Sequence, residues 1–279
     1  MKRKGLLRMA LGLSCVAALA VPVAGQAGQP DSKGNGGRTF YATDDQNNLV
    51  SFSADNPRQL DSSQPISGLP MGVSLRGIDF RPATGELYGV GSDSVVYRVS
   101  PVTAKAVAEG PAFTPALNGR FFGVDFNPTV DRIRVTSDAN QNLRLVPDTG
   151  ALAGADADLN PNDPTVVGSA YTNSSFSATP AASTILYALD ALDDALYVQN
   201  PPNNGTLTMP TPVDINVRGD SGFDIAGKNN VGYVATASDR RPGAELYRVN
   251  VQTGDTMKLG QIGRGALTIT GIAAVQDTP

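Results

Sequence analysis

The sequence contains no histidine and no tryptophan, and it has a single cysteine near its N-terminus. Without histidine the chain lacks the usual general base near neutral pH and the commonest metal ligand. This excludes a Ser-His-Asp triad and the common zinc and copper sites. Any catalysis would have to use carboxylates, Lys, Tyr, Arg or a metal ion held by oxygen atoms.

The cysteine, Cys15, belongs to a segment that reads as a secretory signal peptide. Residues 1–27 have a basic start, an apolar run from about residue 9 to residue 23, and small residues at Gly25 and Ala27 that suit signal peptidase. This run is too short for a lasting membrane span, and no other apolar run is long enough. We therefore expect a secreted or periplasmic protein with no stable membrane span and, after cleavage, no disulfide bond.

Removal of this segment leaves an acidic chain. Residues 1–27 contain four of the 22 Lys and Arg residues and none of the 26 Asp and Glu residues, so the remaining chain has a net charge of −8. A negative surface repels phosphate backbones and anionic lipids, so we expect no nucleic acid as a partner. We expect a monomer that recognises a protein, a glycan or a small ligand.

A repeated stretch predicts the architecture. The segment RGIDFRPATGELYGV at residues 76–90 is echoed by FFGVDFNPTVDRIRV at residues 121–135. Short runs rich in Val, Leu, Ile and Tyr follow, bounded by Gly, Pro, Asn and Asp, which is typical of strands and turns. Four such runs in each unit, at a period of about 45 residues, predict a β-propeller blade. The glycine that opens the unit recurs at steps of 46, 45, 54 and 49 residues, at Gly77, Gly123, Gly168, Gly222 and Gly271.

The last unit predicts how the ring closes. After Gly271 the chain has room for one strand, and three further strands are predicted between residues 38 and 66. Together they complete a blade and leave no open sheet edge between the first and last blades. We therefore predict an all-β, five-bladed propeller with four-stranded blades; a six-bladed propeller and a β-sandwich are the alternatives. The predicted domains are a signal peptide at 1–27, a flexible leader at 28–38 and a single propeller at 39–276.

An aspartate follows the repeated glycine by two positions in three of the five units, at Asp79, Asp125 and Asp224. Both faces of a blade pack on neighbouring blades, so a carboxylate inside the innermost strand needs a partner. One interpretation is structural: each carboxylate accepts hydrogen bonds from backbone N–H groups or an arginine of the adjacent blade. The other is that the carboxylates face the central channel and bind a cation or ligand there. Basic residues just upstream complete the set of channel candidates: Arg76, Arg120 and Arg218.

A second candidate site is the acidic loop GADADLNPNDP at residues 154–164. Asp156, Asp158 and Asn160 alternate in it, and Asp163 follows. Calcium takes six to eight oxygen ligands, so it is the metal that such a loop would hold. The match to a helix-loop-helix calcium loop is poor, because Gly is missing at the sixth position and Val167 stands where Glu is needed. A solvated acidic loop is the alternative interpretation, and no other cofactor is predicted.

The stretches RGIDFRP, GELYGV, GRFFGVDFNPTVDRIRV, QNLRLVPDTGAL and DLNP resemble bacterial secreted proteins of domain-of-unknown-function family 4394 (DUF4394). The resemblance extends over residues 40–275, and its most specific stretch lies in the second unit. It implies an exported bacterial domain with a propeller-like fold, and it supplies no catalytic residues.

Two classes of function follow from these features. The first is a binding or scaffold propeller of the periplasm or cell surface that recognises a ligand or partner at a mouth of the channel. The second is a calcium-dependent hydrolase or lactonase-like enzyme, in which channel carboxylates hold a metal that polarises water or a carbonyl. The sequence favours binding, since a propeller fold does not by itself imply an enzyme and no acid–base pair stands out.

Overall fold

A computed structural model describes residues 37–227, 229–238, 243–264 and 267–277 of the chain. These residues form β-strands and their connections, with one short 3₁₀ turn at Pro202–Asn204. The predicted signal peptide and residues 28–36 of the predicted leader lie outside the described residues. The described part has no helix that is both long and apolar enough to cross a membrane.

The described strands form five antiparallel sheets of four strands each, and each sheet is one blade. Blade 1 consists of β20 (Ile269–Ala274), β1 (Thr39–Asp44), β2 (Asn48–Ser53) and β3 (Leu60–Pro65). Blade 2 consists of β4 (Leu75–Phe80), β5 (Leu87–Gly91), β6 (Val96–Val99) and β7 (Ala106–Ala108). Blade 3 consists of β8 (Phe122–Asn127), β9 (Arg132–Ser137), β10 (Asn142–Leu145) and β11 (Leu152–Ala155).

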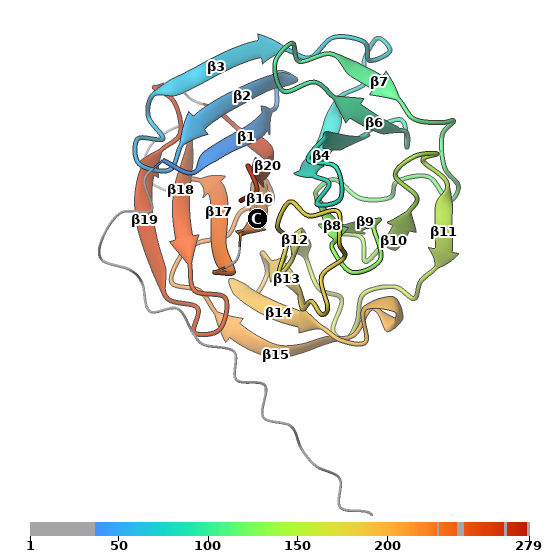
Figure 1. Cartoon of the computed structure of the whole chain (residues 1–279). Helices are drawn as coiled ribbons and strands as arrows, with labels where there is room; N and C mark the ends of the chain where they lie inside the picture. The colour runs from blue at the N-terminus through green and yellow to red at the C-terminus, as the bar shows by residue number, and fades with distance from the viewer. Residues whose placement is uncertain (1–36, 228, 239–242, 265–266, 278–279) are drawn as a thin grey trace, which may run out of the picture. The chain divides into compact units, whose positions relative to one another are not determined.

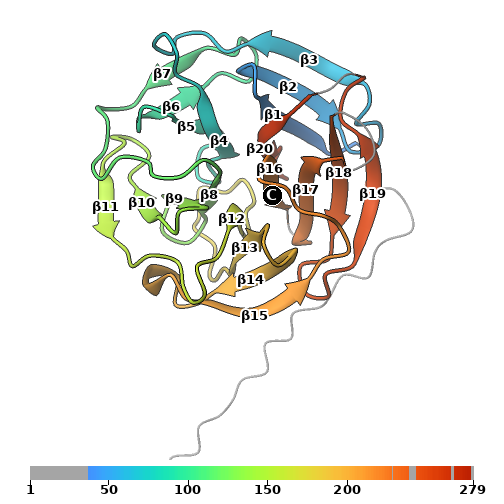
Figure 2. The same ribbon diagram turned by 180° about the vertical axis from the view of Figure 1, so that it is seen from behind.

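Blade 4 consists of β12 (Val166–Tyr171), β13 (Leu186–Asp190), β14 (Ala195–Gln199) and β15 (Leu207–Pro212). Blade 5 consists of β16 (Ser221–Ala226), β17 (Val231–Ala237), β18 (Ala244–Val249) and β19 (Thr256–Gln261). The five blades stand in a ring with β4, β8, β12, β16 and β20 innermost, as Figure 1 and the opposite view in Figure 2 show. The predicted five-bladed propeller is confirmed, and the six-bladed and sandwich alternatives are wrong.

The ring closes by pairing strands from opposite ends of the chain. Strand β20 pairs antiparallel with β1, with Phe40 opposite Ala274 and Ala42 opposite Ile272. Without this pairing, β1 would present a row of unpaired N–H and C=O groups as an open edge. The blade of three N-terminal strands and one C-terminal strand is therefore confirmed.

The two described residues before β1 also contact the ring, and Gly37 donates from its backbone N–H to Asp55 at 2.6 Å. Arg38, which the sequence assigns to the flexible leader, donates to the backbone oxygen of Val275 at 2.9 Å and forms an ion pair with Asp277 at 2.9 Å. Its side chain is only 11% exposed. Arg38 therefore belongs with the folded ring rather than with the leader.

Apolar side chains fill the spaces between neighbouring blades. Every residue of β5 and of β13 is buried, although successive side chains of a strand point to opposite faces. Between blades 1 and 5, the ring of Phe40 stacks on Phe52 at 5.7 Å and meets the edge of Tyr233 at 4.8 Å. Packing on both faces explains why the strand runs read as continuous apolar segments rather than as alternating ones.

The repeated glycine marks the points at which the innermost strands approach one another. A Cβ atom on Gly123 would lie 2.3 Å from the backbone nitrogen of Ser169, and one on Gly222 would lie 2.7 Å from that of Ile272. Only a residue without a side chain leaves room for two backbones at this distance. The space between the glycines is about 10 Å³, close to that of one water molecule. All five repeated glycines line this space: Gly77, Gly123, Gly168, Gly222 and Gly271.

Candidate functional site at the central channel

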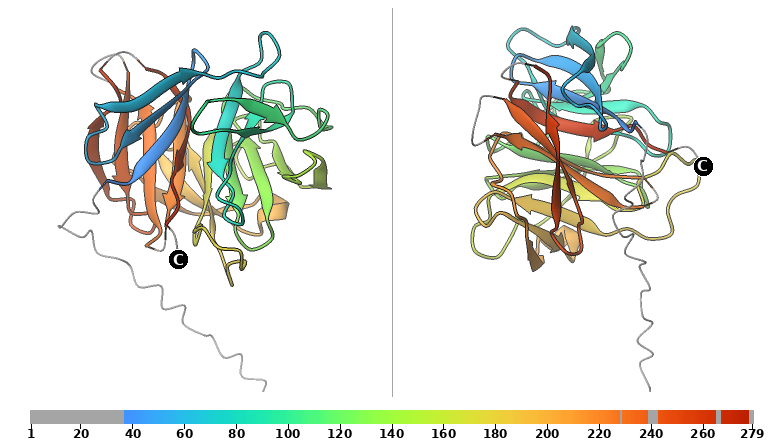
Figure 3. Two further views of the ribbon diagram at one scale, coloured as in Figure 1. Left: turned by 45° about the horizontal axis from the view of Figure 1, so that its top comes forward. Right: turned by 90° about the vertical axis from the view of Figure 1, so that its left-hand side faces the viewer.

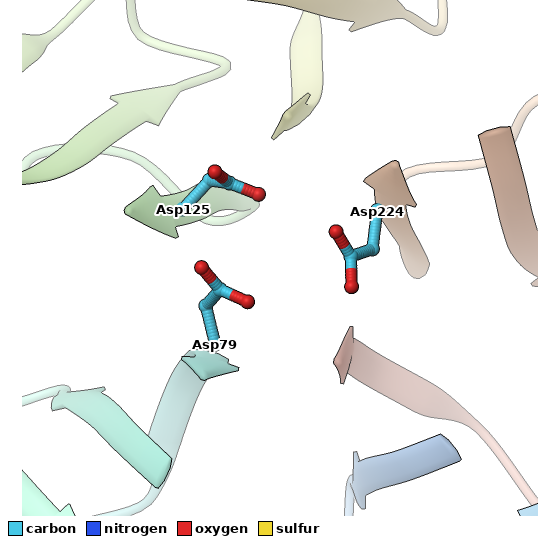
Figure 4. A group of neighbouring side chains, drawn as sticks. All are labelled: Asp79, Asp125 and Asp224. Carbon is cyan, nitrogen blue, oxygen red and sulfur yellow. The ribbon is translucent and has the colours of Figure 1, made fainter. Parts of the chain in front are cut away.

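Three buried carboxylates lie together in the channel. Asp79 on β4, Asp125 on β8 and Asp224 on β16 each follow a repeated glycine by two residues, so they point to the same side of their strands as that glycine. Their exposed fractions are 2%, 1% and 4%. Each offers an oxygen that lies within 4.8 Å of the other two, and Figure 4 shows the carboxylates turned toward one another. We call these three residues the channel triad.

Each triad carboxylate also ties its blade to the next blade around the ring. The donor in each case is the backbone N–H of the residue that follows the equivalent position in that next blade. The bonds are Phe126 N to Asp79 Oδ2 (2.8 Å), Tyr171 N to Asp125 Oδ1 (3.2 Å) and Ala274 N to Asp224 Oδ2 (2.6 Å). The aspartates therefore accept backbone hydrogen bonds and face the channel at the same time, which combines both interpretations of the repeat.

Alanine occupies the triad position in the other two blades, at Ala170 in blade 4 and Ala273 in blade 1. An alanine side chain cannot accept the N–H of the next blade. In both places the aspartate of the next blade accepts the hydrogen bond from the backbone N–H of the residue that follows it in the sequence. These bonds are Phe80 N to Asp79 Oδ1 (2.7 Å) and Ile225 N to the carboxylate of Asp224. Three carboxylates thus satisfy five equivalent N–H groups, which explains why the aspartate repeats in only three units.

Burial raises the pKa of all three carboxyls, and repulsion within the triad adds to it for two of them. Burial is the largest cause in each case. Repulsion by Asp224 adds to it for Asp79, and repulsion by both partners adds to it for Asp125. The pKa of Asp224 rises to about 6, although backbone hydrogen bonds act to lower it. The folded channel therefore favours a triad whose negative charge is partly neutralised.

The three arginines grouped with these aspartates lie at the other end of the innermost strands. Arg76, Arg120 and Arg218 precede the repeated glycine of their units, whereas the aspartates follow it. The guanidinium of Arg120 stands 4.9 Å above the ring of Phe121. The hydrogen bonds that the described residues donate to the triad come from backbone N–H groups. The structure therefore does not bring these arginines to the carboxylates.

The acidic loop has its first carboxylate engaged in the protein. The side chain of Asp156 is 1% exposed and accepts from Arg134 at 2.6 Å and from Arg144 at 2.7 Å. The two arginines stand opposite each other on β9 and β10. This pairing across strands leaves Asp156 as an ion-pair partner rather than a metal ligand, and the linear sequence does not display it.

The other predicted ligands of this loop are directed elsewhere. The amide of Asn160 donates to the backbone oxygens of Asp158 and Asn204 at 2.9 and 2.8 Å, and the carboxylate of Asp163 accepts from Asn140. Among the described residues, the aspartates of the loop do not form a group with oxygens close enough for one ion, whereas the channel triad does. The geometry therefore speaks against a calcium site in this loop.

A long connection crosses the channel mouth toward which the triad residues lie. It joins β12 to β13, and we call residues 172–185 the mouth segment. Figure 1 shows it reaching over the inner strands, and Figure 3 shows it on the same side of the ring as the C-terminal end. Its backbone N–H groups reach four other blades or their ends: Ser177 to Pro82 O, Ala181 to Pro128 O, Phe176 to Asp277 O and Asn173 to Asn230 Oδ1.

The mouth segment and the turns beneath it line a cavity of about 310 Å³ that is open to solvent. Sequence reasoning missed this site, although the 54-residue step of the middle unit and the polar stretch TNSSFSATPAAST were available as signals. Proline and alanine give the cavity apolar walls, and amide, hydroxyl and carboxylate groups give it polar ones. Its lining consists of Pro82, Ala83, Asn127, Pro128, Asp131, Asn173, Ser175, Ser177, Ala178, Thr179, Pro180 and Ala181.

A buried arginine holds the carboxylate of the cavity wall in place. Arg81 is 8% exposed and donates through Nε to Asp131 at 2.9 Å, through Nη1 to Asp148 at 2.6 Å and to the hydroxyl of Tyr88 at 3.3 Å. The hydrogen bond to Asp131 is the largest cause that raises the pKa of Arg81, so this arginine stays charged. The side chain of Asp131 remains 34% exposed, which leaves part of its carboxylate accessible to a ligand.

The chain is similar to solved structures of low sequence identity. One is the crystal structure of a structural genomics protein of unknown function from Bacteroides thetaiotaomicron VPI-5482, with 13% identity, a TM-score of 0.51, and coverage of 87% of this chain and 66% of that chain. Another, entitled "Structure of Dos1 propeller", has 10% identity, a TM-score of 0.39 and coverage of 79% and 58%. The chain thus spans less than two thirds of the length of either protein. At such identity the first similarity shows the fold alone.

Among curated protein sequences, none matches the chain. The family model described as "Domain of unknown function (DUF4394)" matches residues 48–273, from the start of β2 into β20. The resemblance inferred from the repeated motifs is therefore confirmed: this chain, a five-bladed propeller, belongs to the DUF4394 family.

Proposed function

We propose that the chain is an exported bacterial β-propeller that binds a glycan, with one sugar residue in the cavity beneath the mouth segment. The observation that carries this proposal is the cavity itself, which is formed by connections from three blades at one mouth of the channel. Ligand sites are typically preformed concave spaces with apolar walls and a few placed polar groups. Its volume of about 310 Å³ suits a ligand of small size.

The chemistry of the lining supports a sugar. Sugar rings have apolar faces made of C–H groups and hydroxyls around the edge, so they need apolar walls together with hydrogen-bonding groups. Pro82, Pro128 and Pro180 supply apolar surface, and Asp131 supplies an acceptor that Arg81 holds in place. The net charge of −8 disfavours anionic ligands, so a neutral glycan fits the surface better.

Binding rather than hydrolysis is proposed. Glycoside hydrolysis by carboxylates uses a pair of them, one as acid and one as base or nucleophile. Among the described residues that line the cavity, Asp131 is the one carboxylate, and it is ion-paired with Arg81. The alternative, a calcium-dependent hydrolase or lactonase-like enzyme, would use the channel carboxylates Asp79, Asp125 and Asp224, which do not line this cavity.

Export is part of the proposal, and the character of residues 1–27 supports it. We expect the protein in the periplasm or medium of a bacterial host, with Gly28 as its first residue. Cell fractionation and the intact mass of the recovered protein test this. A cytoplasmic protein that retains residues 1–27 would contradict the proposal of export without bearing on the glycan.

Ligand binding is tested with the exported protein and a panel of neutral monosaccharides and disaccharides, by saturation-transfer NMR and calorimetry. Ala178→Trp should fill the cavity and abolish binding, because Ala178 lines it. The matched control is Ala182→Trp, an exposed position of the same mouth segment outside the lining. Absence of binding across the panel, or equal loss in both variants, would contradict a sugar site in this cavity.

A further inference from the structure

The channel triad concentrates negative charge, and no arginine or lysine among the described residues donates a hydrogen bond to it. The charge of Arg38 acts on Asp224 and lowers its pKa, but Arg38 is itself ion-paired with Asp277. The carboxylates of Asp79, Asp125 and Asp224 accept only backbone N–H groups from the described residues. Such groups carry partial charges and do not cancel three full ones. A buried charge has to be neutralised by an opposite charge, by a metal ion or by a proton.

One triad oxygen receives no hydrogen bond from the part of the chain that the structure describes. Asp125 is 1% exposed, yet its carboxylate accepts a single hydrogen bond from the described residues, at Oδ1 from Tyr171. Its Oδ2 accepts no hydrogen bond from the described residues. Figure 4 shows this carboxylate facing the central space that the other two carboxylates also face. A carboxylate oxygen without a donor among the described residues, on a side chain that is 1% exposed and close to two further carboxylates, points to a positively charged occupant of this space.

The chemistry of the ligands indicates which cation fits. One oxygen from each aspartate can be chosen so that all lie within 4.8 Å of one another, so one ion can reach all three carboxylates. Magnesium demands near-ideal octahedral geometry and is usually held through one or two carboxylates. Calcium tolerates irregular geometry and completes its shell with water, so three carboxylates can share one calcium ion.

We propose that the channel triad binds one calcium ion, which neutralises the three carboxylates and links blades 2, 3 and 5 across the channel. Blade 5 is not adjacent to blades 2 or 3, so an ion at this point connects parts of the ring that share no strand pairing. The site is separate from the glycan cavity, and its role is structural. Protons on two of the carboxylates are the competing way to neutralise the triad.

The experiment uses the exported protein, first stripped with a chelator and then titrated with calcium chloride alone, in parallel with magnesium chloride. Native mass spectrometry should show one calcium per chain. Thermal unfolding followed by circular dichroism should shift upward by about 5 °C or more when calcium exceeds its dissociation constant a hundredfold. Magnesium should give a smaller shift.

Two matched variants locate the ion. Asp125→Asn keeps a side-chain oxygen for Tyr171 N and removes the charge and the unpaired oxygen, so it should fold and bind calcium at least tenfold more weakly. Asp158→Asn removes an exposed carboxylate of the acidic loop and should bind calcium as the unchanged protein does.

The proposal is overturned if the unchanged protein binds no calcium at millimolar concentration, because protons then neutralise the triad. It is equally overturned if Asp125→Asn binds as tightly as the unchanged protein, or if Asp158→Asn is the variant that loses the ion. Should Asp125→Asn fail to fold, the stoichiometry and thermal shift of the unchanged protein decide alone. Glycan binding, measured with or without calcium, tests the cavity beneath the mouth segment and does not bear on calcium binding by the channel triad.

Discussion

Raising the pH should weaken the fold when calcium is withheld. Burial raises the pKa of Asp224 from 3.8 to about 6, so the folded chain holds a proton there that the unfolded chain releases. A raised carboxyl pKa contributes stability that is complete below the unfolded value and is lost as the pH rises through the folded one. The free energy of unfolding in a chelator should therefore fall between about pH 4 and pH 6.

The size of this loss follows from the shift. A difference of roughly two pH units corresponds to about 3 kcal/mol, a large part of the roughly 5–15 kcal/mol that holds a domain together. The pKa values of Asp79 and Asp125 are also raised, first by burial and then by triad charges, so both carboxyls add to the loss. Glu86 and Asp148 have pKa values lowered by Arg98 and Arg81, and they act below about pH 4.5.

Urea unfolding at several pH values between 4.5 and 7.5 measures the effect. Far-ultraviolet circular dichroism is the suitable signal because the chain contains no tryptophan. The midpoint should fall with pH in chelator, and Asp125→Asn should flatten the curve because it removes one of the repelling charges. Added calcium should abolish the fall in the unchanged protein. A free energy that stays constant or rises from pH 4.5 to pH 7.5 in chelator would refute the account of the triad given above.

Four further predictions test the fold. Deleting β20 onward, residues 269–279, should open the edge of β1 and cause aggregation, seen by light scattering; an unchanged melting temperature would contradict the ring closure. Gly123→Ala should cost about 1–3 kcal/mol in urea unfolding, because its Cβ meets the backbone of the next blade. Arg134→Met should cost about 3–5 kcal/mol by leaving a buried carboxylate short of a partner, whereas Arg98→Ala, at an exposed pair, should cost little. Asp79→Asn should be less stable than Asp125→Asn by about 1–3 kcal/mol, because only the former strands a backbone N–H.

The repeated motifs predicted the fold and also the three aspartates of the channel triad. The spacing of glycine and aspartate placed Asp79, Asp125 and Asp224 at equivalent points of inner strands, and the structure brings these residues together. Arg76 and Arg120 do not lie with these aspartates. Each arginine precedes the repeated glycine of its unit and each aspartate follows it, so the inner strand places them toward opposite ends of the channel. Closeness along the chain was a poor guide to closeness in space there.

The sequence by itself determined the number of blades, their order and the way the termini complete one of them. It could do so because each inner strand needs a glycine where neighbouring backbones meet, and this requirement repeats at every blade. Only the tertiary structure decided the partners of the polar side chains. Asp156 meets Arg134 and Arg144, and the mouth segment reaches the other blades, through contacts between distant residues. The repeat in the sequence indicates which face of a strand a residue occupies. Its hydrogen-bond or ion-pair partner depends on the size of the ring and on how the blades pack in it.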